Sequence, residues 1–183
     1  MSSSNLKYKD ELTRAMTYLG QDPRVIFLGQ AVAYPGTAMT GTLSGVSDSQ
    51  KLEFPVAEEM QLGASIGLAL GGLIPVTLYP RWNFLLLAVN QLVGHLDKLS
   101  AMSQGGYSPK VIIRTGIGSE RPLHPSHQHV GDFTEAFRSM LTTVEVIRLD
   151  EPEDIFPAYT KALTRQDGCA TICVEFGDSY SEK

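Results

Sequence analysis

Short, unbroken apolar runs alternate along the chain with longer amphipathic segments. The runs show no period of two, which is typical of strands covered on both faces of a parallel sheet. Strands are expected at residues 25–28, 74–79, 111–113, 144–149 and 170–174, with a weaker candidate at 52–56. Helices are expected at residues 6–18, 57–73, 82–102, 132–141 and 151–165. This alternation predicts an α/β fold, an open parallel sheet of about six strands with helices on both faces.

The longest uncharged stretch, residues 60–80, contains 21 residues and meets the length of a membrane-spanning helix. Gly71, Gly72 and Pro75 interrupt it, and the part that follows is short and partly β-branched. A buried helix that runs into a buried strand explains the stretch better, so no association with membranes is expected.

Two segments fall outside the alternation. Residues 31–50 are rich in Gly, Ser and Thr, and residues 116–131 carry three of the four histidines. Both follow predicted strands. Because the ligand crevice of an open α/β sheet lies beyond the carboxyl ends of its strands, these two loops are the candidate site.

Composition and charge narrow the class of protein. The 183 residues, 43% hydrophobic and 19% charged, predict a soluble globular protein with one domain over residues 1–183. A net charge of -5 without basic runs argues against nucleic acid and anionic membranes as partners. The N-terminus lacks the apolar segment of a secretory signal, and Cys169 and Cys173 fit neither a redox motif nor half of a zinc site. A cytoplasmic location is expected.

Glu58 and Glu59 open the predicted helix at 57–73, and two interpretations stay open for them. Acidic side chains in a first turn stabilise the helix dipole. Alternatively, one carboxyl lies at the mouth of an apolar pocket and shares a proton with a ligand nitrogen. Gly63, Gly67 and Gly71 recur on one face of the same helix, which suits either close packing inside the domain or a subunit interface.

Three histidines, His124, His127 and His129, lie close together in the second loop. Metal ligation is one interpretation, but no acid or cysteine partner is near them in sequence, and no metal site is predicted. Contact with a substrate and simple exposure on a loop are the other interpretations.

The order of several motifs is more specific than any one of them. Together they resemble the pyrimidine-binding domain of thiamine-diphosphate enzymes, most closely the amino-terminal half of the beta subunit of pyruvate-type 2-oxo acid dehydrogenases, with transketolase more distant. The resemblance covers about residues 6–176 and implies a thiamine-diphosphate-binding version of the α/β fold. Its motifs are Phe-Leu-Gly-Gln-Ala-Val-Ala at 27–33, Pro-Val-Ala-Glu-Glu-Met at 55–60, Trp-Asn-Phe at 82–84, Met-Ser-Gln-Gly-Gly at 102–106 and Val-Ile-Ile-Arg-Thr-Gly at 111–116.

The resemblance implies roles for particular residues. Glu58 matches the acid that hydrogen-bonds the aminopyrimidine ring and promotes deprotonation of the thiazolium carbon. Phe84 matches the aromatic that stacks on the pyrimidine, with Trp82 and Pro80 beside it lining the pocket. His129, four residues before Phe133, matches the active-site histidine on the substrate side. His127 is the alternative if the loop is shifted.

The chain also departs from the family pattern. Gln30 and Ala31 stand where the dehydrogenase subunits usually have two glutamates, and Glu120 and Arg121 have no match. Neither the carboxyl-terminal transketolase domain nor a Gly-Asp-Gly motif for diphosphate and Mg2+ is found in these 183 residues.

The resemblance therefore implies half of a cofactor site. The first hypothesis is a pyrimidine-side subunit that shares thiamine diphosphate with an alpha-type subunit, in an assembly of two chains of each kind. In this hypothesis the partner binds Mg2+, and the substrate is a 2-oxo acid or a ketose. The alternative is a non-catalytic subunit that keeps the fold for assembly or regulation.

Overall fold

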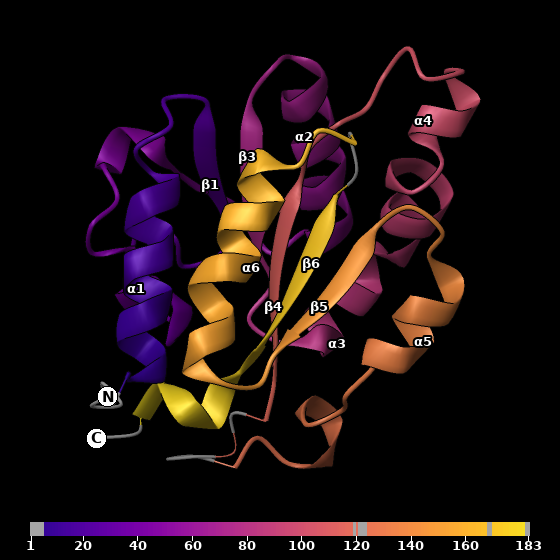
Figure 1. Cartoon of the computed structure of the whole chain (residues 1–183). Coiled ribbons are helices and arrows are strands. Elements are labelled where there is room, and N and C mark those ends of the chain that lie inside the picture. The colour runs from indigo at the N-terminus through magenta and orange to yellow at the C-terminus, as the bar shows by residue number, and fades with distance from the viewer. Residues whose placement is uncertain (1–5, 119, 121–123, 168–169, 182–183) are drawn as a thin grey trace.

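Six strands form one parallel sheet at the centre of the computed structural model, which describes residues 6–118, 120, 124–167 and 170–181 (Figure 1). All neighbouring strands pair in parallel, in the order β2-β1-β3-β4-β6-β5. The sheet confirms the predicted fold class, and the weak strand candidate is the short edge strand β2. The strands are β1 (Val25–Gly29), β2 (Lys51–Glu53), β3 (Ile74–Leu78), β4 (Ile112–Ile117), β5 (Glu145–Leu149) and β6 (Thr171–Phe176).

Helices cover both faces of this sheet. On one face, α1 and α6 pack together in front of the strands (Figure 1), and their apolar side chains form one buried cluster with β1 and β3. On the other face, α2, α3 and α5 contribute to a second cluster. The helices are α1 (Tyr8–Leu19), α2 (Glu58–Leu70), α3 (Trp82–Leu85), α4 (Leu99–Met102), α5 (Thr134–Met140) and α6 (Pro152–Thr164).

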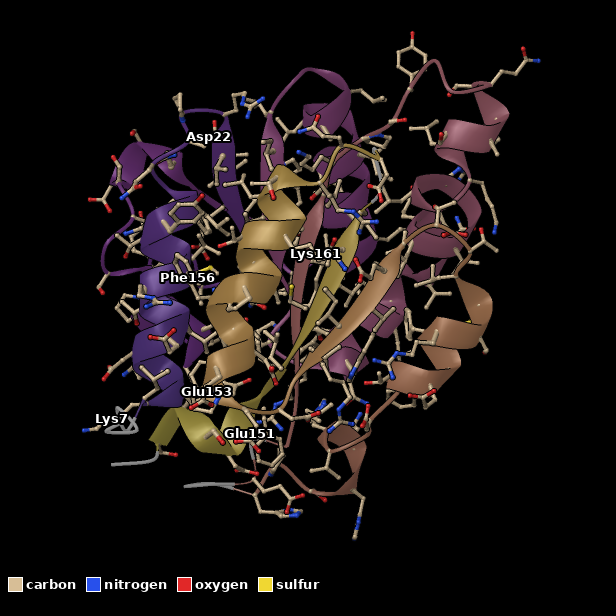
Figure 2. The ribbon with its side chains drawn as sticks, viewed as in Figure 1. Lys7, Asp22, Glu151, Glu153, Phe156 and Lys161 are labelled. Carbon is tan, nitrogen blue, oxygen red and sulfur yellow. The ribbon has the colours of Figure 1, made fainter. Side chains whose placement is uncertain are left out.

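The contact between α1 and α6 centres on Phe156, which points from α6 toward α1 (Figure 2). The guanidinium carbon of Arg14 lies 3.9 Å from the centre of the Phe156 ring, and the Tyr18 ring lies 5.2 Å from it. At the start of α1, the Tyr8 hydroxyl donates to the carbonyl oxygen of Leu149 at 2.6 Å and accepts from the amide of Phe176 at 2.7 Å. These bonds fix α1 against the carboxyl ends of β5 and β6.

The segment expected to form one helix over residues 82–102 is interrupted. After α3 come a 3-10 turn (Leu86–Ala88), a π-helix (Asn90–Leu96) and the short α4. The wide π turn bonds the amide of Asp97 to the carbonyl of Leu92, and the Asp97 carboxylate is buried. That carboxylate accepts backbone N–H groups from residues 142–144. The prediction of one regular helix was wrong because it ignored this tertiary contact.

The uncharged stretch at residues 60–80 folds into α2 followed by β3, as the sequence predicts. Unlike β3, α2 is buried on only one face, since Met60 and Leu70 are exposed. A Cβ added at Gly67 would meet nothing within 4 Å, so close packing inside the described chain does not explain that glycine. Within the described residues, the helices are too short or too polar to cross a membrane.

Candidate functional site

A cavity of about 480 Å³ opens at the carboxyl edge of the sheet, beyond β1, β3, β4 and β6. Residues of the first candidate loop form one wall, the segment at the start of α3 forms another, and Gly116 and Gly177 lie at its base. A Cβ added at Gly116 would lie 3.3 Å from the carbonyl oxygen of Pro80, so the base is closely packed. The described lining residues are Gln30, Ala31, Gly36, Thr37, Ala38, Met39, Pro80, Arg81, Phe84, Gly116, Gly177 and Tyr180.

The loop wall is organised by Glu53 at the end of β2. Its carboxylate accepts backbone N–H groups from Ala31, Val32 and Ala33 at 2.7–2.9 Å. Burial raises the pKa of Glu53, but these N–H bonds outweigh burial and hold the pKa below its ordinary value. Ala31 has a left-handed backbone (φ 57°), so the carboxylate holds a turn that an alanine rarely adopts alone. Sequence reasoning missed Glu53, whose only signal is an acid at a strand end.

A buried charge cluster lies under the cavity. Arg114 on β4 donates to Glu175 on β6 at 2.7 and 3.1 Å and to Thr42 at 3.1 Å. The Tyr159 and Tyr180 hydroxyls also donate to Glu175. Burial first, and then the negative charge of Glu175, raise the pKa of both tyrosines far above its ordinary value. Tyr180, which lines the cavity, therefore stays protonated.

Phe84 and His129 are brought together beside this cavity. Their rings stack with centroids 5.5 Å apart and an interplanar angle of 28°. The Arg81 Nη1 donates to the carbonyl oxygen of His129 at 3.1 Å, which ties the second candidate loop to the segment before α3. Pro80 and Phe84 line the cavity, whereas His129 is half-buried and is not among the described lining residues. The Nδ1 atom of His129 is buried without a hydrogen-bond partner among the described residues.

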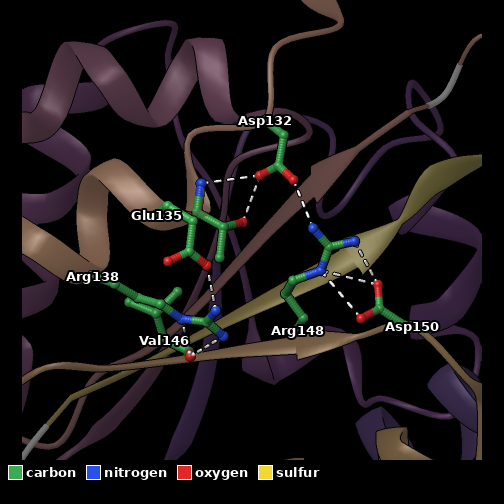
Figure 3. Close-up of polar contacts among 7 residues, drawn as sticks. Asp132, Glu135, Arg138, Val146, Arg148 and Asp150 are labelled. Atoms are coloured by element: carbon green, nitrogen blue, oxygen red, sulfur yellow. Dashed lines mark hydrogen bonds and ion pairs between the residues drawn. The ribbon is translucent and has the colours of Figure 1, made fainter.

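The loop that carries His129 is anchored where it enters α5. Asp132 accepts from the amide and the hydroxyl of Thr134 at 3.0 and 2.6 Å, which caps the start of the helix. Its second oxygen accepts from Arg148 on β5 at 2.7 Å, and Arg148 also donates to Asp150 (Figure 3). The anchor limits the movement of the segment on which His129 lies.

Glu58 lies in a different place. It is the first residue of α2, and the Tyr79 hydroxyl donates to its carbonyl oxygen at 3.3 Å. Its side chain borders a shallow hollow that it shares with Ala57, Glu59, Met60 and Leu87, and it is absent from the described lining of the cavity. Val56, Met60 and Leu87 are 54–68% exposed around it. The described chain therefore leaves Glu58 on an open, apolar surface.

The remaining expected site residues are placed as follows. Trp82 is fully buried, with its ring 4.5 Å from that of Phe137, so it belongs to the core rather than to the described cavity wall. His127 is exposed, and the Nε2 atom of His124 lies 3.2 Å from the Oε2 atom of Glu120. Among the described residues, no cluster of three or more His, Cys, Asp or Glu side chains is arranged to hold a metal ion. Cys173 is buried, and Cys169 lies outside the described residues.

A parallel sheet with helices on both faces and a cavity at its carboxyl edge defines the open α/β class of domains, in which ligands bind at that edge. Residues 5–175 match the family model for the pyrimidine-binding domain of transketolase, and the chain belongs to this family. The family is that of thiamine-diphosphate enzymes, as the sequence motifs indicated.

Similar proteins and a similar solved structure are consistent with this assignment to the family. The chain is 27% identical over 183 residues to the pyruvate dehydrogenase E1 component subunit beta of Ascaris suum, covering 98% of this chain and 49% of the relative. It is 32% identical over 110 residues to the corresponding subunit of Chaetosphaeridium globosum, covering 58% and 34%. The solved structure of a split-gene transketolase, an inactive beta4 tetramer, has the same fold with a TM-score of 0.70 at 16% identity, covering 93% and 51%. The chain thus spans about half of the length of two of these proteins and about a third of the other.

Of the residues that the resemblance assigns to the pyrimidine ring, Phe84 and Pro80 line the described cavity. Phe84 offers an aromatic ring at the cavity wall. Beside it, Asn83 Oδ1 and His129 Nδ1 are buried polar atoms without a partner among the described residues. Buried polar atoms of this kind are commonly satisfied by a ligand or by water.

Proposed function

We propose that the chain is the pyrimidine-side subunit of a split thiamine-diphosphate enzyme that acts on a 2-oxo acid or a ketose, by decarboxylation or two-carbon transfer. In this proposal a separate alpha-type subunit binds the diphosphate and Mg2+, and the assembly contains two chains of each kind. Membership in the pyrimidine-binding family supports it. The observation that carries it is the position of Glu58, which lies among exposed apolar side chains on the surface of a chain whose Phe84 lines a formed cavity.

Four of the expected site residues, Phe84, Pro80, Glu58 and His129, have a task in this proposal. When bound, thiamine diphosphate supplies an electron sink for the carbon next to the substrate carbonyl. Phe84 packs against a ring face, and Pro80 limits the space beside it. Glu58 holds a proton at its carboxylate and shares it with a ring nitrogen. His129 holds or releases a proton on the substrate side, and the anchor from Asp132 to Arg148 keeps its loop in place.

The apolar surface around Glu58 supports a partner at this position. Large exposed apolar side chains in a cluster mark interaction surfaces more often than single ones do. A partner that covers Val56, Met60 and Leu87 would also remove water from Glu58, which strengthens its hydrogen bonds. The same surface also suits a non-catalytic subunit that serves assembly, so an experiment must separate the two functions.

Calorimetry with thiamine diphosphate and Mg2+ tests the proposal. The purified chain alone should show no tight binding, because the diphosphate and the metal provide the strongest charge interactions of the cofactor and need ligands of their own. Micromolar binding and turnover should appear only after mixing with an alpha-type chain that carries the Gly-Asp-Gly motif. Micromolar binding by the chain alone would contradict the split site. A complex that binds the cofactor without turnover would favour the non-catalytic subunit.

A matched pair of variants tests where the partner binds. Leu87→Glu places a charge on the apolar surface beside Glu58 and should abolish complex formation, measured by analytical ultracentrifugation. Met102→Glu is the control, because Met102 is 68% exposed on α4, far from the carboxyl edge of the sheet (Figure 1). If both variants assemble like the unmodified chain, the partner does not use this surface.

A further inference from the structure

The loop wall of the cavity is neutral, and few of its side chains can form hydrogen bonds. Among the described residues that line this wall, Gln30 and Thr37 have polar side chains, and neither carries a formal charge. The others are Ala31, Gly36, Ala38 and Met39. The two polar side chains therefore determine which ligand groups this wall can recognise.

The fold fixes the loop beside both residues. The Glu53 carboxylate holds the backbone N–H group of Ala31, directly after Gln30. A Cβ added at Gly36 would lie 2.7 Å from the Cβ of Ala31, so the loop folds back on itself just before Thr37. Both polar side chains extend from a backbone that is formed before a ligand binds, which lowers the cost of ordering it on binding.

The hydrogen bonds around Thr37 determine where its hydroxyl proton points. The Thr40 hydroxyl donates its single proton to the carbonyl oxygen of Ala31 at 2.5 Å. The hydroxyl oxygens of Thr37 and Thr40 lie 3.2 Å apart. Because a hydroxyl group has one proton to donate, Thr37 is the donor in this second bond. Toward a ligand in the cavity, the Thr37 oxygen is then an acceptor of hydrogen bonds.

Tyr180 and Gln30 complete the polar inventory of this side of the cavity. The Tyr180 hydroxyl donates its proton to Glu175, so it offers no O–H donor to a ligand. Gln30 is exposed at the cavity, and its amide carries both donors and acceptors. A ligand that matches this side must therefore bring a proton to Thr37 and can exchange a second hydrogen bond with Gln30.

We infer that Gln30 and Thr37 form a hydroxyl-binding subsite, and that the substrate of this cavity is a ketose rather than a 2-oxo acid without hydroxyl groups. The inference rests on the proposed function and narrows its substrate class. Thr37 accepts the proton of one ligand hydroxyl, and the Gln30 amide bonds to a second. A simple 2-oxo acid is ionised at neutral pH and carries only acceptor oxygens, which would face the acceptor oxygen of Thr37 without a proton between them.

The test compares three small ligands with the same number of non-hydrogen atoms. Dihydroxyacetone carries two hydroxyl groups, diethyl ketone has methyl groups in their place, and pyruvate is an anion without a hydroxyl. NMR titration of the chain with millimolar ligand measures each affinity without the cofactor. Dihydroxyacetone should bind most tightly. Equal binding of dihydroxyacetone and diethyl ketone, or no binding of any of the three, would overturn the inference. Tighter binding of pyruvate would overturn it as well, because the charge of Arg81 on the other wall would then outweigh the loop wall.

Variants of the loop wall connect the preference to the two side chains. Thr37→Val keeps the shape of the side chain without its oxygen, and Gln30→Met removes the amide. Each should weaken dihydroxyacetone binding about three- to tenfold and leave diethyl ketone unchanged. A preference for dihydroxyacetone that survives either variant undiminished would overturn the inference.

Two further variants separate recognition from a change in the fold. Thr37→Ser keeps the hydroxyl and should retain most of the affinity, so a loss equal to that of Thr37→Val would overturn the inference. Thr164→Val is the matched control, because Thr164 is exposed at the end of α6 and its hydroxyl donates to the carbonyl oxygen of Thr160. Thermal unfolding verifies that each variant folds. Failure of the complex to bind thiamine diphosphate would contradict the proposed function alone, since the titration does not use the cofactor.

Discussion

The two residues that the family resemblance assigns to the pyrimidine ring, Phe84 and Glu58, lie in opposite surroundings. Phe84 lines a cavity of about 480 Å³ and stacks on His129. The loops around it are held by Glu53, Arg81 and Asp132. Glu58 borders a shallow hollow whose apolar neighbours are exposed.

The difference distinguishes a cavity wall that the chain forms by itself from a surface that it leaves exposed. On the Phe84 side, hydrogen bonds from three elements fix the cavity wall before any ligand arrives, which lowers the cost of ordering it on binding. On the Glu58 side, Tyr79 bonds to the helix start, but Glu58 is only half-buried and its apolar neighbours are exposed. We therefore expect substitutions on the two sides to have different effects on turnover and on cofactor binding.

The largest effect is expected at Glu58. In a reconstituted complex, Glu58→Gln should reduce turnover about 10²- to 10⁴-fold, because the amide keeps the shape of the side chain but cannot share a proton. Steady-state kinetics measures the loss, and circular dichroism verifies that the fold is intact. Glu59→Gln, one residue further along α2, is the matched control and should be much milder. If Glu59 is the sensitive position, the assignment is shifted by one residue.

The sequence predicted the fold well because its strands are buried on both faces and therefore read as continuous apolar runs. Phe84 and Pro80 line the cavity because both follow β3, whose carboxyl end faces it. The family resemblance placed Trp82 beside Phe84 in the pocket lining, whereas Trp82 is buried in the core. Neighbouring side chains of a helix point in different directions, and only the packing of Phe137 against α3 shows which of them is buried.

An intermediate effect on turnover is expected at His129, which stacks on Phe84 beside the cavity. His129→Ala should lower turnover about 10²-fold and also weaken cofactor binding slightly, because it removes both the imidazole and the ring stacked on Phe84. His129→Phe should lower turnover equally while preserving cofactor affinity, since it keeps a ring but no titratable nitrogen. Turnover and the cofactor dissociation constant are measured separately, with His127→Ala as the control. A His129→Phe enzyme with normal turnover would limit His129 to a packing role.

The residues that hold the cavity wall could not be identified from patterns in the sequence. Glu53, Asp132 and Arg148 act through contacts between segments 16 to 22 positions apart. Such contacts depend on which strand ends meet at the edge of the sheet, and local patterns of hydrophobic residues carry no such information. The exposed apolar side chains around Glu58 were equally hidden, because the sequence does not show which face of α2 packs inward.

The smallest effect on activity, and a distinct effect on stability, is expected at Glu53. The pKa of the Glu53 carboxyl is lower in the folded chain than in the unfolded chain, where it is about 4.3. The ionised carboxylate therefore stabilises the fold fully above the unfolded-state pKa, and this stabilisation is lost as pH falls through the folded-state pKa. Glu53→Gln should therefore lower the free energy of unfolding by about 1 to 3 kcal/mol at neutral pH, and by less at about pH 3. Urea unfolding at both pH values measures the difference. Asp48→Asn, at a fully exposed acid a few residues earlier, is the control and should change the free energy of unfolding at neither pH.

The effect of Glu53→Gln on activity should be small, because Glu53 holds the loop wall by its backbone. Turnover should change only a few-fold, which corresponds to about 1 kcal/mol or less in the activation barrier. An equal stability difference at both pH values would show that the carboxylate charge does not hold the wall.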